Sequence, residues 1–223
     1  MIAGLAAAVL TGCGGDDTSD AADPATTGAS EPTTGQETAS SPTADECTEL
    51  FATSSGWSEV GELGEPEATT VAGVPACRAA VSDSRLAVTA AQVIALPAGA
   101  WAEGLPDAIN QLLASGVITD QDNLDKLEDG RELIESVDGI DDDAACDLFT
   151  TLIVAVQHTA EDATSVINAV PTEDAPMAVN GQACSHGHYT SVQVENAAGV
   201  AAGTELPDLI RDVLADVHPG PLR

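Results

Sequence analysis

The fold of this chain is decided by a stretch that occurs twice. It reads Cys47-Thr48-Glu49-Leu50-Phe51-Ala52-Thr53 in the first half and Cys146-Asp147-Leu148-Phe149-Thr150-Thr151 in the second, with one residue less between cysteine and leucine. Two further pairs of landmarks follow in the same order: Gly73–Cys77 with Gly181–Cys184, and Leu105–Ile109 with Leu206–Ile210. The three pairs are offset by 99, 107 and 101 positions, so their shared order predicts an internal duplication.

Each copy is predicted to hold both helix and strand. A helix is expected near each Cys-x-Leu-Phe segment, followed by a turn-rich stretch that leads to the second cysteine. Strand-like runs come next, at Arg85–Leu96 and at His188–Glu195, where polar and apolar residues alternate as in a half-buried strand. Each copy then ends in a helix with proline in its first turn, where the missing N–H is harmless. We therefore predict an α+β fold of two similar halves, each held by one disulfide.

The boundaries follow from the landmarks. The first repeat is expected over 46–120, a connecting helix over 121–145 and the second repeat over 146–223. Apolar residues at helical spacing place an amphipathic helix at Asn123–Val137. The apolar run Thr151–Val156 fits either an extension of the helix at Phe149 or a buried strand, because a continuous run has no diagnostic period.

The N-terminal residues have the pattern expected of a targeting signal. The apolar run Ile2–Leu10 is followed by Leu10-Thr11-Gly12-Cys13, which resembles the lipobox of bacterial lipoproteins. The resemblance implies a signal peptide over 1–12, cleavage before Cys13 and lipidation of Cys13, with palmitate as an expected acyl group. No Lys or Arg precedes Ile2, so we expect the natural start to lie a few residues earlier.

Residues 13–45 are predicted to be a disordered tether. They consist mainly of Thr, Ser, Pro, Ala, Gly and acidic residues and contain no large apolar side chain, so they cannot bury enough surface to offset the entropy of ordering. Lipobox, tether and compact disulfide-bonded domain together resemble the small secreted lipoproteins of actinobacteria. The expected location is the extracytoplasmic face of the cell membrane.

The charge of the chain excludes one class of partner. Lys and Arg number 6 against 37 Asp and Glu, for a net charge of −31. Such a chain repels phosphate backbones, so no nucleic-acid partner is expected. It also disfavours electrostatic docking on anionic lipid, which leaves the anchor on Cys13 as the expected membrane contact.

The cysteine count agrees with export. Four cysteines remain besides Cys13, and an even number in an exported protein indicates disulfides. Three pairings are possible, and the repeat favours Cys47–Cys77 and Cys146–Cys184.

Metal binding is considered at two places. In Cys184-Ser185-His186-Gly187-His188, a strand would direct Cys184, His186 and His188 to one face, where the imidazoles could bind copper or zinc. A disulfide at Cys184 would remove its thiolate, and a surface pair of histidines is the ordinary interpretation. The acidic stretches Asp120–Asp125 and Asp138–Asp143 suggest weak calcium binding, but neither fits an EF-hand loop, and helix capping explains them equally well.

Catalysis has little support in the sequence. No nucleophile elbow, zinc-protease helix or phosphate-binding loop occurs. We therefore expect no enzyme, no cofactor and no assigned metal, with a secreted hydrolase and a Cu/Zn or Ca-binding lipoprotein as the alternatives. The favoured function is a non-catalytic binding surface for a protein partner or a small apolar ligand, with a pocket expected at the seam between the halves. Trp57 and Trp101 are either pocket-lining or core residues.

Overall fold

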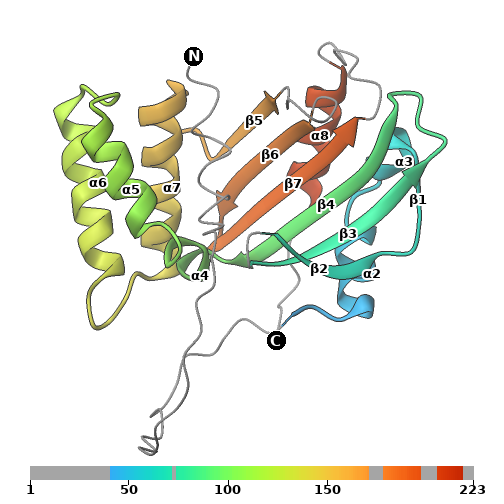
Figure 1. The fold of residues 1–223 in the computed structure, drawn as a ribbon, viewed down its shortest axis with the longest axis horizontal. Coiled ribbons are helices and arrows are strands. Elements are labelled where there is room, and N and C mark those ends of the chain that lie inside the picture. Colours follow the sequence, from blue (N-terminus) through green and yellow to red (C-terminus); the bar gives the residue numbers. More distant parts are fainter. Residues whose placement is uncertain (1–40, 72–73, 171–177, 197–204, 218–223) are drawn as a thin grey trace, which may run out of the picture.

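The chain forms an α+β fold in which one antiparallel sheet carries helices on both faces (Figure 1). The computed structural model describes residues 41–71, 74–170, 178–196 and 205–217. The predicted signal peptide, Cys13 and most of the predicted tether lie outside these residues.

The described elements have the following bounds. The helices are α2 (Ala44–Ala52), α3 (Trp57–Val60), α4 (Ala98–Ala102), α5 (Pro106–Ser115), α6 (Gln121–Ile134), α7 (Asp142–Gln157) and α8 (Glu205–Asp216). The strands are β1 (Glu62–Leu63), β2 (Glu67–Val71), β3 (Val74–Ser82), β4 (Val88–Pro97), β5 (Ser165–Val170), β6 (Ala178–Ser185) and β7 (His188–Asn196).

The two halves of the chain share this sheet. Its order is β1-β3-β4-β7-β6-β5, and β2 also pairs with β3. The central pair is β4 with β7, which runs in antiparallel register from Val88 opposite Asn196 to Pro97 opposite His188. The halves are therefore joined by backbone hydrogen bonds along the middle of one sheet.

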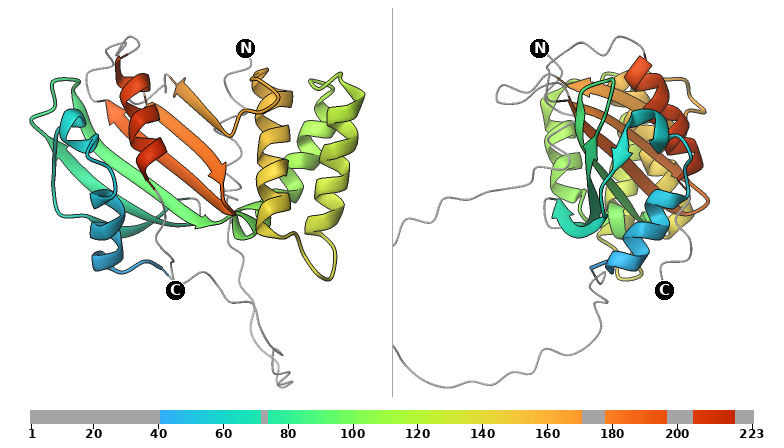
Figure 2. Two further views of the ribbon diagram at one scale, coloured as in Figure 1. Left: turned by 180° about the vertical axis from the view of Figure 1, so that it is seen from behind. Right: turned by 90° about the vertical axis from the view of Figure 1, so that its right-hand side faces the viewer.

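Apolar side chains form one cluster on each face of the sheet. The first lies beneath α2, α3 and α8 and includes Phe51, Trp57 and Ile210; Figure 2 shows these three helices together on the side hidden in Figure 1. The second lies against α4, α5, α6 and α7 and includes Phe149 and Tyr189. The alternation predicted for β7 explains the division, since Val192 and Val194 belong to the first cluster and Tyr189 to the second.

Both favoured disulfides are present, Cys47–Cys77 and Cys146–Cys184. Each joins a helix near the start of its half to the middle one of three strands. Cys47 and Cys77 lie in the first apolar cluster, whereas Cys184 lies in the second with Cys146 packed against it. The two disulfides therefore lie on opposite faces of the sheet.

Several predicted elements are confirmed. Helices α2 and α7 contain the two Cys-x-Leu-Phe segments, α6 corresponds to the connecting helix, and α5 begins at Pro106. The run Thr151–Val156 continues α7. Helix α2 begins within the range assigned to the tether, because Thr43 and Glu46 form a capping box at its start.

The stretches before Cys77 and Cys184, which are expected to be rich in turns, are mainly strand. They contain the strand pairs β2–β3 and β5–β6, which the sequence analysis did not predict. Their glycines, prolines and amides resemble turn signals, although the strands that contain them are continuous.

The face that carries α4 to α7 is open away from those helices (Figure 1). There a row of polar side chains runs across six strands at one level of the sheet, made of Glu67, Arg78, Gln92, Gln193, Asn180 and Asn168. All six are exposed or half-buried. Polar side chains at this level let the open part of the face contact water without a covering helix.

Candidate functional site

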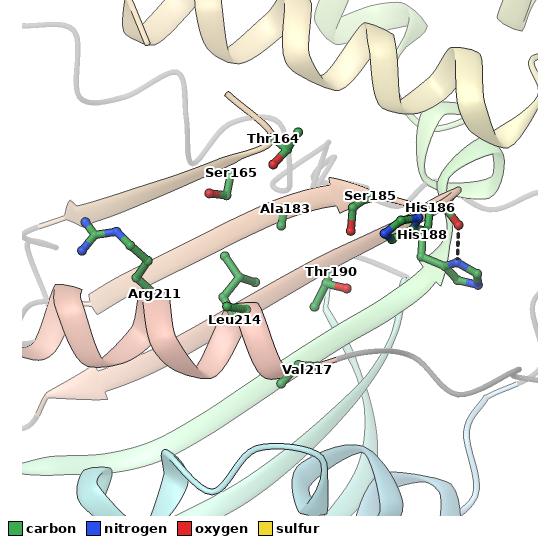
Figure 3. A pocket seen from close by; sticks show the side chains of 11 residues that line it. Thr164, Ser165, Ala183, Ser185, His186, His188, Thr190, Arg211, Leu214 and Val217 are labelled. Atoms are coloured by element: carbon green, nitrogen blue, oxygen red, sulfur yellow. Dashed lines mark hydrogen bonds between the residues drawn. The ribbon is translucent and has the colours of Figure 1, made fainter. Parts of the chain in front are cut away.

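A pocket of about 390 Å³ lies between α8 and the strands β5, β6 and β7 (Figure 3). Its lining combines hydroxyl groups, two imidazoles, one guanidinium and small apolar groups: Thr164, Ser165, Ala183, Ser185, His186, His188, Thr190, Arg211, Leu214, Ala215 and Val217. Strand β4 contributes no lining residue. The pocket therefore belongs to the second half, and the expectation of a pocket at the seam between the halves is not met by this one.

The pocket exists because α8 touches the sheet closely at one point and leaves room beyond it. A Cβ at Gly181 would lie 2.8 Å from Ile167 Cδ1, 3.1 Å from Ile210 Cγ2 and 3.3 Å from Leu214 Cδ2, so glycine allows this close approach of helix to strand without displacing those side chains. Two residues further along β6 the lining residue is Ala183, and α8 presents Ala215. These short side chains leave the space between helix and sheet unfilled.

Thr190 is the most deeply buried polar group of the pocket. It is 5% exposed, because β7 runs beneath α8 and directs alternate side chains, Thr190, Val192 and Val194, toward that helix. Among the described residues, no hydrogen bond of its hydroxyl group is found, and its oxygen is not one of the fully enclosed polar atoms that lack a partner. A hydroxyl that reaches the space of a pocket can exchange a water molecule for a polar group of a ligand. The Thr190 hydroxyl is therefore available to a bound molecule.

Arg211 supplies the positive charge at the other end of the pocket from the histidines (Figure 3). Its Nη1 donates to Asp208 Oδ1 at 2.5 Å, one turn earlier on α8. A guanidinium has five N–H donors, so most of them remain free of this contact. The side chain is 55% exposed and can reach a molecule that enters the pocket.

His186 is the first residue of the tight turn between β6 and β7, and His188 is the first residue of β7. His186 and Gly187 both have positive φ, at 52° and 75°, as a two-residue hairpin turn requires. His188 Nδ1 lies 3.0 Å from the carbonyl oxygen of His186, and Figure 3 shows the two rings pointing away from each other on either side of the turn.

The structure does not place Cys184 on one face with the two histidines, although the sequence pattern predicts this. Strand β6 ends at Ser185, so the alternation does not continue to His186. Cys184 points to the opposite face and is bonded to Cys146. Over the described ranges, no group of three or more His, Cys, Asp or Glu residues is arranged to hold a metal ion.

The acidic stretches act as helix caps. The side chain of Asp120 accepts from the N–H of Asn123 at the start of α6, and Asp141 accepts from Ala144 at the start of α7. Asp142 Oδ1 accepts from the N–H of Gly99 at 2.8 Å and so ties α7 to α4. These contacts account for three of the carboxylates considered for calcium.

The two tryptophans lie outside this pocket. Trp57 is 2% exposed in the first cluster, where its ring centroid lies 5.1 Å from that of Phe51. Trp101 stacks on Tyr189 with centroids 4.7 Å apart, and Phe149 meets both rings edge-on. Burial raises the pKa of Tyr189, against smaller opposing effects of hydrogen bonds with Ser191 and Trp101. This aromatic group fixes β7 from the face opposite the pocket.

Comparison of the chain with protein-family models, with curated protein sequences and with solved structures finds no match.

Proposed function

We propose that the chain is a lipid-anchored protein of the bacterial envelope that binds a small molecule, without chemistry, in the pocket beneath α8. The observation that carries the proposal is the Thr190 hydroxyl, which belongs to a 5% exposed residue at the wall of this pocket and has no hydrogen bond among the described residues. A pocket of about 390 Å³ with a few converging polar groups is typical of small-molecule sites.

Binding without chemistry is supported by how the reactive residue types are arranged. Serine and histidine both line the pocket, but a nucleophilic serine needs a hydrogen-bonded base and a group that orients that base. No hydrogen bond joins Ser165 or Ser185 to an imidazole in the described part of the chain, and no carboxylate is among the lining residues.

The anchor is supported by the lipobox and by the composition of the tether behind it. Among the helices of the described ranges, none combines the length and apolarity needed to span a bilayer. A chain held by acyl groups on Cys13 needs no such helix, because each buried CH₂ contributes about 0.8 kcal/mol and two or three chains hold stably.

The anchoring proposal is tested by replacing Cys13 with Ser and fractionating cells. Wild-type protein and the tether control Ser19→Ala should be in the membrane fraction, and the Cys13→Ser protein should not. Equal membrane association of all three proteins would contradict the proposal.

The binding proposal is tested by blocking the pocket. Ala183→Trp fills the space beside Leu214, and Ala100→Trp places the same ring on the exposed side of α4 as the matched control. A panel of alkyl carboxylates, alcohols and amines is screened by ligand-observed NMR. Probes should bind the wild type and the Ala100→Trp variant but not the Ala183→Trp variant. Absence of binding throughout, or binding that Ala183→Trp leaves unchanged, would contradict the proposal.

We also propose that the two halves arose by duplication. The support is the common order of helix, three strands and helix, as α2, β2 to β4 and α5 and as α7, β5 to β7 and α8, with a helix-to-middle-strand disulfide in each. The disulfides lie on opposite faces, and so do the closing helices α5 and α8, so the proposal requires that both helices of one copy exchanged faces. A related chain with one copy alone would support it, and relatives with this fold but without the three landmarks would speak against it.

A further inference from the structure

The lining of the pocket beneath α8 differs in charge from the rest of the chain. The chain has 37 acidic residues against 6 Lys and Arg and 4 His. Three of these ten basic side chains line the pocket, namely Arg211, His186 and His188, whereas none of the acidic residues does. Apart from Asp208, which pairs with Arg211 from outside the lining, the described lining of the pocket is thus without negative charge on a strongly acidic protein.

The polar groups of the pocket are suited to donate hydrogen bonds. Thr190 is buried and its hydroxyl has no hydrogen bond among the described residues, while Ser165 on β5 and Ser185 on β6 add two further hydroxyl groups to the lining. Arg211 has N–H groups beyond the one bonded to Asp208. The hydroxyl groups and the free N–H donors of Arg211 favour an acceptor with negative charge, since charge-assisted hydrogen bonds are the stronger ones and no carboxylate is among the lining residues.

The remaining lining residues indicate the size and polarity of the rest of the ligand. Ala183, Leu214 and Val217 form an apolar middle between the Arg211 end and the histidine end (Figure 3). A pocket of about 390 Å³ is near the lower end of the range for small-molecule sites. We infer that the ligand is a small organic anion, with a carboxylate or phosphate head group and a short apolar portion. This inference rests on the proposed function and specifies its ligand.

The test compares probes that share one tail. Octanoate, octyl phosphate, octanol and octylamine are titrated calorimetrically into the full Cys13→Ser protein. The two anions should bind about tenfold more tightly than the alcohol or the amine, as expected when a charge-assisted hydrogen bond replaces a neutral one. Equal or tighter binding of octanol or octylamine would overturn the inference while leaving the pocket a binding site. No binding of any probe would overturn both proposals.

Substitutions around the head group sharpen this test. Arg211→Gln should weaken octanoate binding severalfold, and Asp208→Asn should strengthen it, because it removes the negative charge that now pairs with Arg211. Arg131→Gln on α6 is the control for net charge, since it removes the same charge outside the pocket. If Arg211→Gln and Arg131→Gln have the same effect, the local charge does not recognise the ligand and the inference fails.

Thr190→Val separates binding from folding. Valine has nearly the shape of threonine, and the lost hydroxyl has no partner in the described part of the chain, so the thermal midpoint should not fall. Octanoate binding should weaken severalfold and octanol binding should change less. A lower thermal midpoint with unchanged octanoate affinity would show a structural role of this hydroxyl and would overturn its assignment to the ligand.

Discussion

Removal of the Cys146–Cys184 disulfide should destabilise the whole fold and weaken the pocket in particular. The bond closes a loop with a sequence separation of 38 residues. In the loop-closure model this constrains the unfolded chain enough to contribute about 4 kcal/mol to the free energy of unfolding. Cys184 is 2% exposed within the second apolar cluster, so loss of its sulfur also removes packing.

The matched comparison is with the other disulfide. Cys47–Cys77 has a sequence separation of 30 residues, and the model assigns it nearly the same contribution, about 0.2 kcal/mol less. The double variants Cys146→Ala/Cys184→Ala and Cys47→Ala/Cys77→Ala are therefore expected to lose similar amounts of stability in urea unfolding followed by far-ultraviolet circular dichroism.

The two variants should differ in ligand binding. Cys184 directly precedes the lining residues Ser185 and His186, and the bond to α7 fixes this end of β6. The affinity for octanoate should therefore fall further in Cys146→Ala/Cys184→Ala than in Cys47→Ala/Cys77→Ala. Wild-type stability in both variants would refute the argument from loop closure. Equal affinity in both would refute the positioning of the turn by Cys146–Cys184.

Two further predictions concern the sheet. Gly61→Ala should lower the free energy of unfolding by about 1–3 kcal/mol, measured by urea unfolding, because the new Cβ would lie 2.7 Å from the backbone oxygen of Ser82. Gly64→Ala is the control and should cost clearly less, because its new Cβ would have its nearest contact at 3.5 Å. Equal losses in the two variants would contradict the close contact at Gly61. Tyr189 is the single tyrosine of the chain, and burial raises its pKa above the ordinary 10.0. Just above pH 10 the tyrosine therefore ionises only in the unfolded chain. The free energy of unfolding should fall as the pH rises past that value. Phenolate absorbance should be absent from the folded protein at about pH 11 and appear only on unfolding, whereas its appearance with circular dichroism unchanged would contradict the burial.

The sequence predicted those parts of the fold that depend on local pattern. The helices around Leu50 and Leu148, the proline-led helix at Pro106 and the alternation in β7 all follow from periodicity and capping. The disulfide pairing followed from the order of the landmarks. The period of the run Thr151–Val156 does not distinguish helix from strand, and the structure shows that it is part of helix α7.

The missed strands depend on contacts between distant segments. In β6, Asn180 and Gly181 resemble a turn signal, but Gly181 is there because α8 packs against it from the end of the chain. In β3, Pro75 disfavours a central strand, yet it lies opposite Thr70 of β2 within the ladder. Neither cause is visible in a local window of sequence.

The candidate site was predicted only in part. The sequence pattern points to His186 and His188 as candidates for metal binding, and both line the pocket. It gives no signal that Arg211 and Thr190 belong to the same site. Arg211 reads as one basic residue on an amphipathic helix, and Thr190 as one polar residue near a strand. Their meeting depends on how α8 crosses β6 and β7, which no spacing in the sequence specifies.

The most direct test of the account is a crystal structure of the Cys13→Ser protein grown with octyl phosphate. The account predicts the phosphate within hydrogen-bond distance of the Thr190 hydroxyl or the Arg211 guanidinium, with the alkyl chain against Leu214 and Val217. An empty pocket at saturating octyl phosphate, or the alkyl chain bound there with its phosphate directed away from both donors, would contradict it.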